Sequence, residues 1–141
     1  MKHFVRTSAL ALAALGLASG LAQAGSARAT LMHYEKLARA AGHFPAGGFS
    51  AKRGSAFFHA RHGGGRPATP SCTTCHTKSP RNWGRTRAGK RIAPVALSKT
   101  PDRFSDLAKV EKWFHRNCRS VLGRDCTVRE KGDYIAYMMS Q

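Results

Sequence analysis

Residues 71–80 read SCTTCHTKSP, and they place Cys72, Cys75 and His76 in the order Cys-x-x-Cys-His. This order is the attachment signature of a c-type haem. Each thiol can add across one vinyl group of the haem, and the histidine that follows can then place an imidazole nitrogen on the iron. The chain is therefore predicted to fold around one covalently bound haem c, with Cys72 and Cys75 as attachment residues and His76 as an iron ligand.

Two other roles of a Cys-x-x-Cys pair fit the sequence less well. A thioredoxin-like redox pair would need a strand before it and a helix after it, whereas HGGGRPATP precedes the motif and TKSPRNWG follows it. A structural zinc site could recruit Cys118 and Cys126 as its second ligand pair. Their spacing is unusual for such a site, however, and His76 would be left without a role.

The N-terminal segment has the pattern of a secretory signal peptide. A basic start leads into an apolar run over about residues 9–21, which ends in small residues. Cleavage is expected after Ala24, and a second small-residue site follows Ala29. We therefore predict a signal peptide over residues 1–24 and a single c-type cytochrome domain over residues 25–141, exported to a periplasm. The apolar run is too short and too often interrupted for a membrane anchor.

The chain is strongly basic, with a formal net charge of +17. Nucleic acid is the usual partner of such a charge, but an exported protein rarely meets any, so no nucleic-acid partner is expected. Steering onto an acidic redox partner or an anionic membrane surface is favoured instead. Candidates for docking, for pairing with haem propionates or simply for a solvated loop are Lys78, Arg81, Arg85, Arg87, Lys90 and Arg91.

Cysteine counting predicts one disulfide. If the haem uses Cys72 and Cys75, only Cys118 and Cys126 remain, and an oxidising compartment then allows a single pairing. The bond would close the short loop CRSVLGRDC. Because short loops gain least from a cross-link, it should stiffen this segment more than it stabilises the domain.

Hydrophobic periodicity and capping residues predict four helices. They cover residues 30–41, 50–60, about 100–117 and 129–140. The stretch from Thr77 to Thr100 shows no periodicity and is long for a loop in so small a domain, which indicates that it wraps a haem edge. Candidate haem contacts within it are Ile92, Val95 and Leu97.

The third of these helices has the clearest start signal. Thr100 can cap it, Pro101 suits its first turn, and Asp102 favours the positive end of the helix dipole. Its apolar stripe ends in a polar residue, Asn117, after Leu107, Val110 and Phe114. Judged by position alone, Asn117 is an ordinary helix-ending residue, because asparagine is absent from the usual haem ligands.

Several residues compete for the iron position opposite His76. Methionine is the habitual sixth ligand of an electron-carrier cytochrome, which makes Met138 and Met139 candidates. A His/Met pair would give a plain carrier whose iron binds nothing else. The remaining candidates are Met32, His33, His43, His59, His62 and His115.

The segment from about Ser71 to Tyr137 closely resembles the sphaeroides haem protein (SHP) family of oxygen-binding c-type cytochromes. The matching stretches are SCTTCHT, GRTRAGKRIAPVALSKTPDRFSD, KVEKWFHRNC, VLGRDCT and EKGDYIAY. The resemblance implies an all-α fold, a variant of the class I cytochrome c fold with about four helices around one haem. It also implies that Asn117 is the second axial ligand, beside a disulfide between Cys118 and Cys126.

An asparagine ligand predicts a site that opens on reduction. An amide oxygen is a hard donor that suits ferric iron better than the softer ferrous ion. We therefore expect a periplasmic mono-haem cytochrome that accepts an electron, releases Asn117 and binds a diatomic gas (O2, NO or CO). The resemblance implies a di-haem cytochrome c and a membrane cytochrome b as redox partners, and it leaves open an oxygenase or nitric-oxide-converting activity. The alternatives are the plain His/Met electron carrier and a gas sensor.

Overall fold

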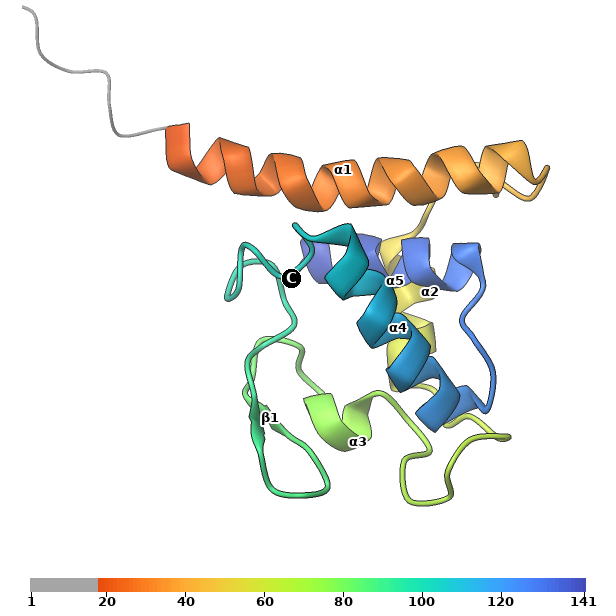
Figure 1. Ribbon diagram of the computed structural model, residues 1–141, viewed down its shortest axis with the longest axis vertical. Coiled ribbons are helices and arrows are strands. Elements are labelled where there is room, and N and C mark those ends of the chain that lie inside the picture. Colours follow the sequence, from red (N-terminus) through yellow and green to blue (C-terminus); the bar gives the residue numbers. More distant parts are fainter. Residues whose placement is uncertain (1–17) are drawn as a thin grey trace, which may run out of the picture.

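The computed structural model describes residues 18–141, and Figure 1 shows their arrangement. In chain order the elements are α1 (Ala18–Ala40), α2 (Ala51–His59), α3 (Thr73–His76), β1 (Gly84–Arg85), β2 (Arg91–Ile92), α4 (Leu107–Leu122) and α5 (Val128–Met139). The protein is thus mostly helical. Among the residues described, no helix has the length and apolar character needed to cross a membrane.

Helix α1 is longer than the helix predicted over residues 30–41. It extends back to Ala18 and runs through both predicted cleavage positions, after Ala24 and Ala29. Most of the apolar run of the predicted signal peptide lies in residues 1–17, outside the described residues. Removal of a signal peptide and export to a periplasm stay predictions.

The core lies where α5 packs against α2 and α1. Figure 1 shows α1 crossing one end of the molecule, with α3 and β1 at the opposite end and α4 running between. The largest fully buried side chains are Tyr34, Phe58, Ile135 and Met138. The haem motif therefore sits at the end of the molecule away from α1.

The close crossing of α2 and α5 depends on Gly54. A Cβ atom at this position would lie 1.9 Å from the backbone oxygen of Asp133, so only glycine permits the approach. Arg53 donates to both carboxylate oxygens of Asp133 at 2.8 Å, and the N–H of Ser50 donates to one of them at 2.7 Å. Asp133 is buried, and a buried charge is tolerated when it is paired. The ion pair therefore fixes how α5 lies on α2, and Ser50 caps the start of α2.

A second polar cluster joins α1, α4 and α5. The hydroxyl of Tyr34, which is fully buried, donates to Oε1 of Glu111 at 2.5 Å. Lys131 donates to Oε2 of Glu111 at 2.6 Å. Burial, followed by the hydrogen bond to Glu111, holds the pKa of Tyr34 far above its ordinary value. The phenol therefore stays a donor, and three helices meet at one carboxylate.

The predicted start of the third helix is wrong. Helix α4 begins at Leu107 rather than near Thr100, and Asp106 caps it. The carbonyl of Phe104, which a longer helix would use in its own backbone ladder, accepts the hydroxyl of Thr30 on α1 at 2.7 Å. Phe104 is also buried. Packing against α1 therefore outweighs the local start signal.

The stretch from Thr77 to Thr100, predicted to lack regular structure, contains a short antiparallel ribbon. Strands β1 and β2 pair with Gly84 opposite Ile92. A Cβ atom at Gly84 would lie 2.1 Å from the backbone oxygen of Cys75. The backbone of the ribbon is thus pressed directly against the haem motif.

The three predicted haem contacts in this stretch differ in burial. Val95 belongs to the hydrophobic core, whereas Ile92 and Leu97 are half-buried. The N–H groups of Val95 and Ala96 both donate to the carbonyl of Pro80 at 2.9 Å. The far end of the stretch is therefore tied back to the segment that leaves the motif.

Candidate haem site

The haem motif forms the single-turn helix α3, which follows Cys72 and ends at His76. The N–H of His76 donates to the carbonyl of Cys72 at 3.1 Å. Side chains three and four residues apart share one face of a helix, and Cys75 and His76 stand at these spacings from Cys72. The structure therefore brings together the three residues that the attachment signature requires.

Burial shifts the pKa values of two motif residues, Cys72 and His76. Both cysteines are free thiols and half-buried. Burial raises the pKa of the Cys72 thiol to about 11, and the neighbouring Cys75 contributes in the same direction. Burial also lowers the pKa of His76 to about 4, assisted by the positive charge of Arg103. At neutral pH His76 is therefore an uncharged imidazole, the form that can ligate a metal.

The chain leaves the motif through a strained residue. Thr77 has φ 63° and ψ 173°, and it is the one non-glycine residue with positive φ in the part of the chain described. A β-branched residue in this region is an outlier, and such a conformation costs about 1–3 kcal/mol. Its hydroxyl donates to the carbonyl of Ser79 at 2.9 Å. The turn ends α3 immediately after His76.

A row of aromatic rings connects the motif with α4. The ring of His76 lies 6.5 Å from that of Phe58, Phe58 lies 6.1 Å from Tyr134, and Tyr134 lies 5.4 Å from Phe114. Burial holds the pKa of Tyr134 well above its usual range, so this phenol stays neutral. Phe114 precedes Asn117 by three residues on α4. The row therefore runs from the predicted iron ligand to the helix that carries the second one.

Asn117 is exposed on α4 and borders the buried face instead of continuing it. The next residue, Cys118, is buried and forms a disulfide with Cys126, with their Cα atoms 5.5 Å apart. The aromatic row, not a direct contact, links the helix of Asn117 to His76. The residues of α4 that are buried are Val110, Phe114, Cys118, Val121 and Leu122.

Ionic contacts hold the loop that the disulfide closes. Arg119 donates to the two carboxylate oxygens of Asp125 at 3.2 and 3.1 Å, and Nδ1 of His115 lies 2.9 Å from the same carboxylate. The hydrogen bond from Arg119 lowers the pKa of Asp125, and His115 acts in the same direction. Exposed pairs contribute little stability. His115 and Arg119 flank Asn117 in the sequence, and through Asp125 both hold the loop along α4.

The other candidate ligands are buried in the core, exposed on the surface or bonded to backbone groups. Met138 is fully buried in the core, Met139 packs against the same core, and Met32 is 59% exposed on α1. Ring nitrogens of His59 and His62 lie 2.9 Å from backbone carbonyl oxygens. In residues 18–141, no group of three or more His, Cys, Asp or Glu is placed to hold a metal. The disulfide also removes the second ligand pair that a zinc site would need.

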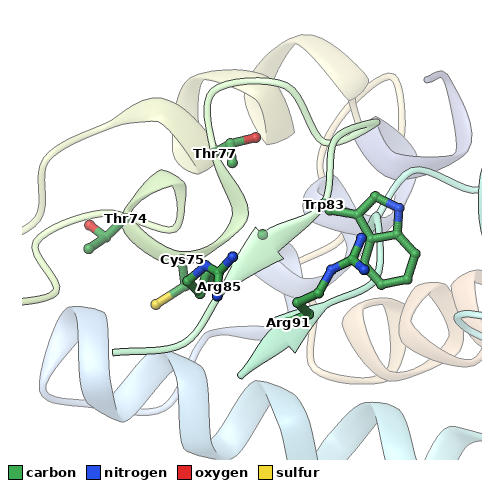
Figure 2. A pocket seen from close by; sticks show the side chains of 7 residues that line it. Thr74, Cys75, Thr77, Trp83, Arg85 and Arg91 are labelled. Carbon is green, nitrogen blue, oxygen red and sulfur yellow. The ribbon is translucent and has the colours of Figure 1, made fainter. Parts of the chain in front are cut away.

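A hollow of about 560 Å³ opens beside the motif, on the side of the ribbon (Figure 2). Two guanidinium groups face it, from Arg85 on β1 and Arg91 on β2, and the Arg91 guanidinium carbon lies 4.1 Å from the centre of the Trp83 ring. Of the three residues of the attachment signature, Cys75 lines the hollow, whereas Cys72 and His76 do not. It therefore adjoins the attachment edge and not the ligand face.

The residues present fit a haem c. Two free thiols on one turn and an uncharged imidazole at its end form the donor set, and aromatic rings supply an apolar wall. The bare backbone of Gly84 holds the turn from behind. Cys72, Cys75 and His76 would therefore hold the group, which supplies one-electron redox chemistry and an iron with two axial positions.

Sequence reasoning missed part of this site. Phe58 and Tyr134 lie within predicted helices, where a buried aromatic residue is most often part of the core, so no signal marked them as neighbours of the haem motif. No sequence pattern marks Arg103 as a neighbour of the motif, yet its positive charge helps to lower the pKa of His76. The strain at Thr77 had no signal at all, because threonine is not expected at positive φ.

Comparisons with known proteins agree with this site. A family model described as a domain of unknown function (DUF1924) matches residues 45–138. Cytochrome c-type protein SHP of Cereibacter sphaeroides is 57% identical over 91 residues, which are 64% of this chain and 70% of that protein.

Two solved structures are also similar. Oxidised SHP, described as an oxygen-binding cytochrome c, superposes with a TM-score of 0.73 at 49% identity, covering 82% of this chain and 96% of that one. Cytochrome c'' of Methylophilus methylotrophus, whose solution structure is described as giving insight into haem-ligand detachment, has a TM-score of 0.66 at 31% identity, covering 83% of this chain and 94% of that one.

Sequence identity, helical architecture and the geometry of the motif thus point to the same group of proteins. The predicted all-α fold, a variant of the class I cytochrome c fold, is confirmed. The chain belongs to the SHP family of c-type cytochromes, helical proteins with covalently bound haem c.

Proposed function

We propose that this protein is a periplasmic cytochrome with one haem, which accepts an electron from a partner cytochrome, releases Asn117 and then binds a diatomic gas. Two similar proteins support the proposal: SHP is an oxygen-binding cytochrome c, and the structure of cytochrome c'' bears on haem-ligand detachment. The di-haem cytochrome c and membrane cytochrome b implied by the resemblance are the proposed electron donors.

The chemistry of Asn117 carries the mechanism. Its amide oxygen is a hard, neutral donor, which binds ferric iron better than the softer ferrous ion. His76 is a neutral imidazole on a short, tightly packed turn and would hold the iron in both oxidation states. Reduction of a bound haem would therefore weaken the hold of Asn117 and not that of His76, and the position that Asn117 leaves would be open to O2, NO or CO.

The disulfide keeps the departing ligand close. Asn117 precedes Cys118, whose bond to Cys126 holds the end of α4 against the loop that follows it. Arg119 and Asp125 pair across the same loop. With the backbone held, the Asn117 side chain is free to swing out and to return on reoxidation without unwinding the helix.

The single observation that favours this function over a closed electron carrier is the place of the methionines. Met138 is fully buried, and its carbonyl accepts a hydrogen bond from the N–H of Leu97 at 2.9 Å. Moving its thioether to an iron would leave a cavity in the core at a cost of about 2–5 kcal/mol. Met139 packs against the same core. An exposed Asn117 needs no such rearrangement.

The test is a set of optical spectra of the purified holoprotein, oxidised, then reduced without oxygen, then exposed to CO. The wild type is expected to shift with CO, and Asn117→Met is expected to stay closed, because a thioether holds ferrous iron. Asn82→Met, which changes the other asparagine of the chain at an exposed loop position, is the matched control and should behave like the wild type. Equal CO binding by all three proteins would contradict the role of Asn117.

A further inference from the structure

We propose that the ribbon beside the motif is the docking surface for an acidic redox protein, which delivers its electron to the haem that Cys72, Cys75 and His76 would hold. This inference rests on the proposed function, because it names the surface through which the electron arrives. We call this surface the ribbon surface. It consists of Trp83 and the exposed basic residues Lys78, Arg81, Arg85, Arg87, Lys90 and Arg91.

The distribution of charge along the chain is uneven. All seven acidic residues lie at Glu35 or from Asp102 onward, so residues 36–101 contain none. The ion pairs of residues 18–141 all lie outside the ribbon surface. The five acids in these pairs are Glu35, Glu111, Asp125, Glu130 and Asp133. The positive charge of the ribbon surface is therefore not neutralised within the protein, and it attracts an acidic partner.

The ribbon holds this charge close to the attachment residue. Gly84 lies against the carbonyl of Cys75 with no room for a side chain between them, and Arg85 follows it directly on β1. Arg85 is fixed by a hydrogen bond from its guanidinium to the carbonyl of Gly89 at 2.9 Å. The charge of Arg85 is therefore held beside the attachment residue.

Trp83 supplies the apolar centre that a docking surface needs. Its side chain is 55% exposed although it is a large hydrophobic residue. Arg91 stacks on its ring (Figure 2), which orients both the indole and the guanidinium. Tryptophan and arginine are the residues most often found at the energetic centres of protein interfaces. An exposed pair of this kind, surrounded by unpaired positive charge, fits a protein partner.

The hollow favours an acidic protein over a lipid surface. Its lining combines the two guanidinium groups with Thr74 and Thr77 around about 560 Å³. A projecting Asp or Glu side chain can enter such a recess and accept paired hydrogen bonds from arginine. A layer of lipid phosphates would meet only the outer basic residues. The one electron that the partner loses would reduce the haem that the motif holds, and the release of Asn117 would follow as in the proposed function.

The test measures reduction of the ferric holoprotein by stopped flow, with a reduced plant-type [2Fe–2S] ferredoxin as the acidic one-electron probe. Arg85→Gln combined with Arg91→Gln is expected to lower the second-order rate constant about tenfold at low salt and to flatten its dependence on salt. Arg85→Lys with Arg91→Lys keeps the charge and should stay within about twofold of the wild type. The matched control, Lys36→Gln with Lys52→Gln, removes two exposed charges from α1 and α2, and it should also change the rate less than about twofold.

Equal losses in the glutamine variant and the control would overturn the proposal, since they would show that only total charge matters. The membrane alternative is measured by sedimentation with phosphatidylglycerol vesicles. If the glutamine variant lost vesicle binding but kept the ferredoxin rate, the surface would be a lipid contact, and the proposal would be wrong.

Two further readouts separate this proposal from the proposed function. Reduction by the cationic complex hexaammineruthenium(II) should not be slowed in any variant, so a slower rate would indicate a damaged haem site. The CO spectrum should be the same in all variants. A wild type that fails to bind CO would remove the proposed function and still leave the ferredoxin rates to decide the docking surface.

Discussion

The two predicted iron ligands are held by different means. His76 ends a one-turn helix that is packed from several sides: Gly84 touches the carbonyl of Cys75, and the buried ring of Phe58 faces the imidazole. Asn117 is exposed on a long helix, and what restrains it is the disulfide of the next residue. A ligand fixed by packing cannot leave without disturbing the fold. An exposed ligand on a helix that a disulfide restrains can leave without such a disturbance.

The largest expected effect concerns the packed side. Gly84→Val would place a side chain where even a Cβ atom meets the oxygen of Cys75 at 2.1 Å, so the ribbon must move away from the motif. We expect the free energy of unfolding to fall by about 3 kcal/mol and the haem content of the purified protein to drop. Guanidinium unfolding and a haem assay check this. Gly63→Ala is the control, because a Cβ atom added there would meet no atom within 4 Å beyond its chain neighbours. Equal losses in both variants would count against the packed turn.

The tethered side is tested by removing the disulfide. Replacing Cys118 and Cys126 together by serine is expected to lower the free energy of unfolding by about 2.5 kcal/mol, because the loop between them is short. The larger consequence should be functional: with the end of α4 loosened, the ferrous protein should bind CO severalfold faster. Stopped-flow CO binding measures this, and Asp125→Asn, which breaks only the exposed ionic contacts, is the control. Identical rates in the wild type and the serine variant would show that the tether does not govern Asn117.

The start of α5 follows directly after the loop that the disulfide closes. It makes the free energy of unfolding depend on pH. Glu130 completes a capping box with Thr127, and the hydrogen bond from Arg124, followed by those at Thr127, holds the pKa of Glu130 below its ordinary 4.5. A depressed carboxyl pKa stabilises the fold above the unfolded value and loses that contribution as the pH falls through the folded value. Unfolding free energy should therefore decline below about pH 4.5.

Glu130→Gln should lessen that decline and cost about 1 kcal/mol at pH 7, because it removes the charge that pairs with Arg124. Glu35→Gln, in an exposed pair with Arg39, should change the pH profile much less. Thermal unfolding across the pH range distinguishes the two variants, and superimposable profiles would contradict the role of the Glu130 charge and its pairing with Arg124.

The smallest effect is expected at the exit from α3. Thr77→Gly relieves the strained φ of 63° and should raise the free energy of unfolding by about 1 kcal/mol. Thr73→Gly, inside the same turn, should lower it by a similar amount because glycine is unfavourable in a helix. The two substitutions should therefore change the free energy of unfolding in opposite directions. If both substitutions destabilised the protein equally, Thr77 would not be strained.

The packed and tethered sides also differ in how far the sequence predicted them. The haem motif, α2 and α5 were predicted within a residue or two, because the signals that mark them act locally. The start of α4 was wrong because Phe104 packs on α1, a contact between distant parts of the chain. Asn117 was singled out by resemblance alone, since no local pattern marks an amide as a ligand.

The spin state of the reduced protein tests the central claim most directly. The ferrous wild-type holoprotein, kept under argon without added ligand, should give a high-spin optical and magnetic circular dichroism spectrum, because the hard amide of Asn117 leaves the iron on reduction. The oxidised protein should be low-spin under the same conditions and should recover that state on reoxidation. A low-spin ferrous spectrum would mean that a ligand stays bound on both sides, and the account of a releasable Asn117 would be wrong.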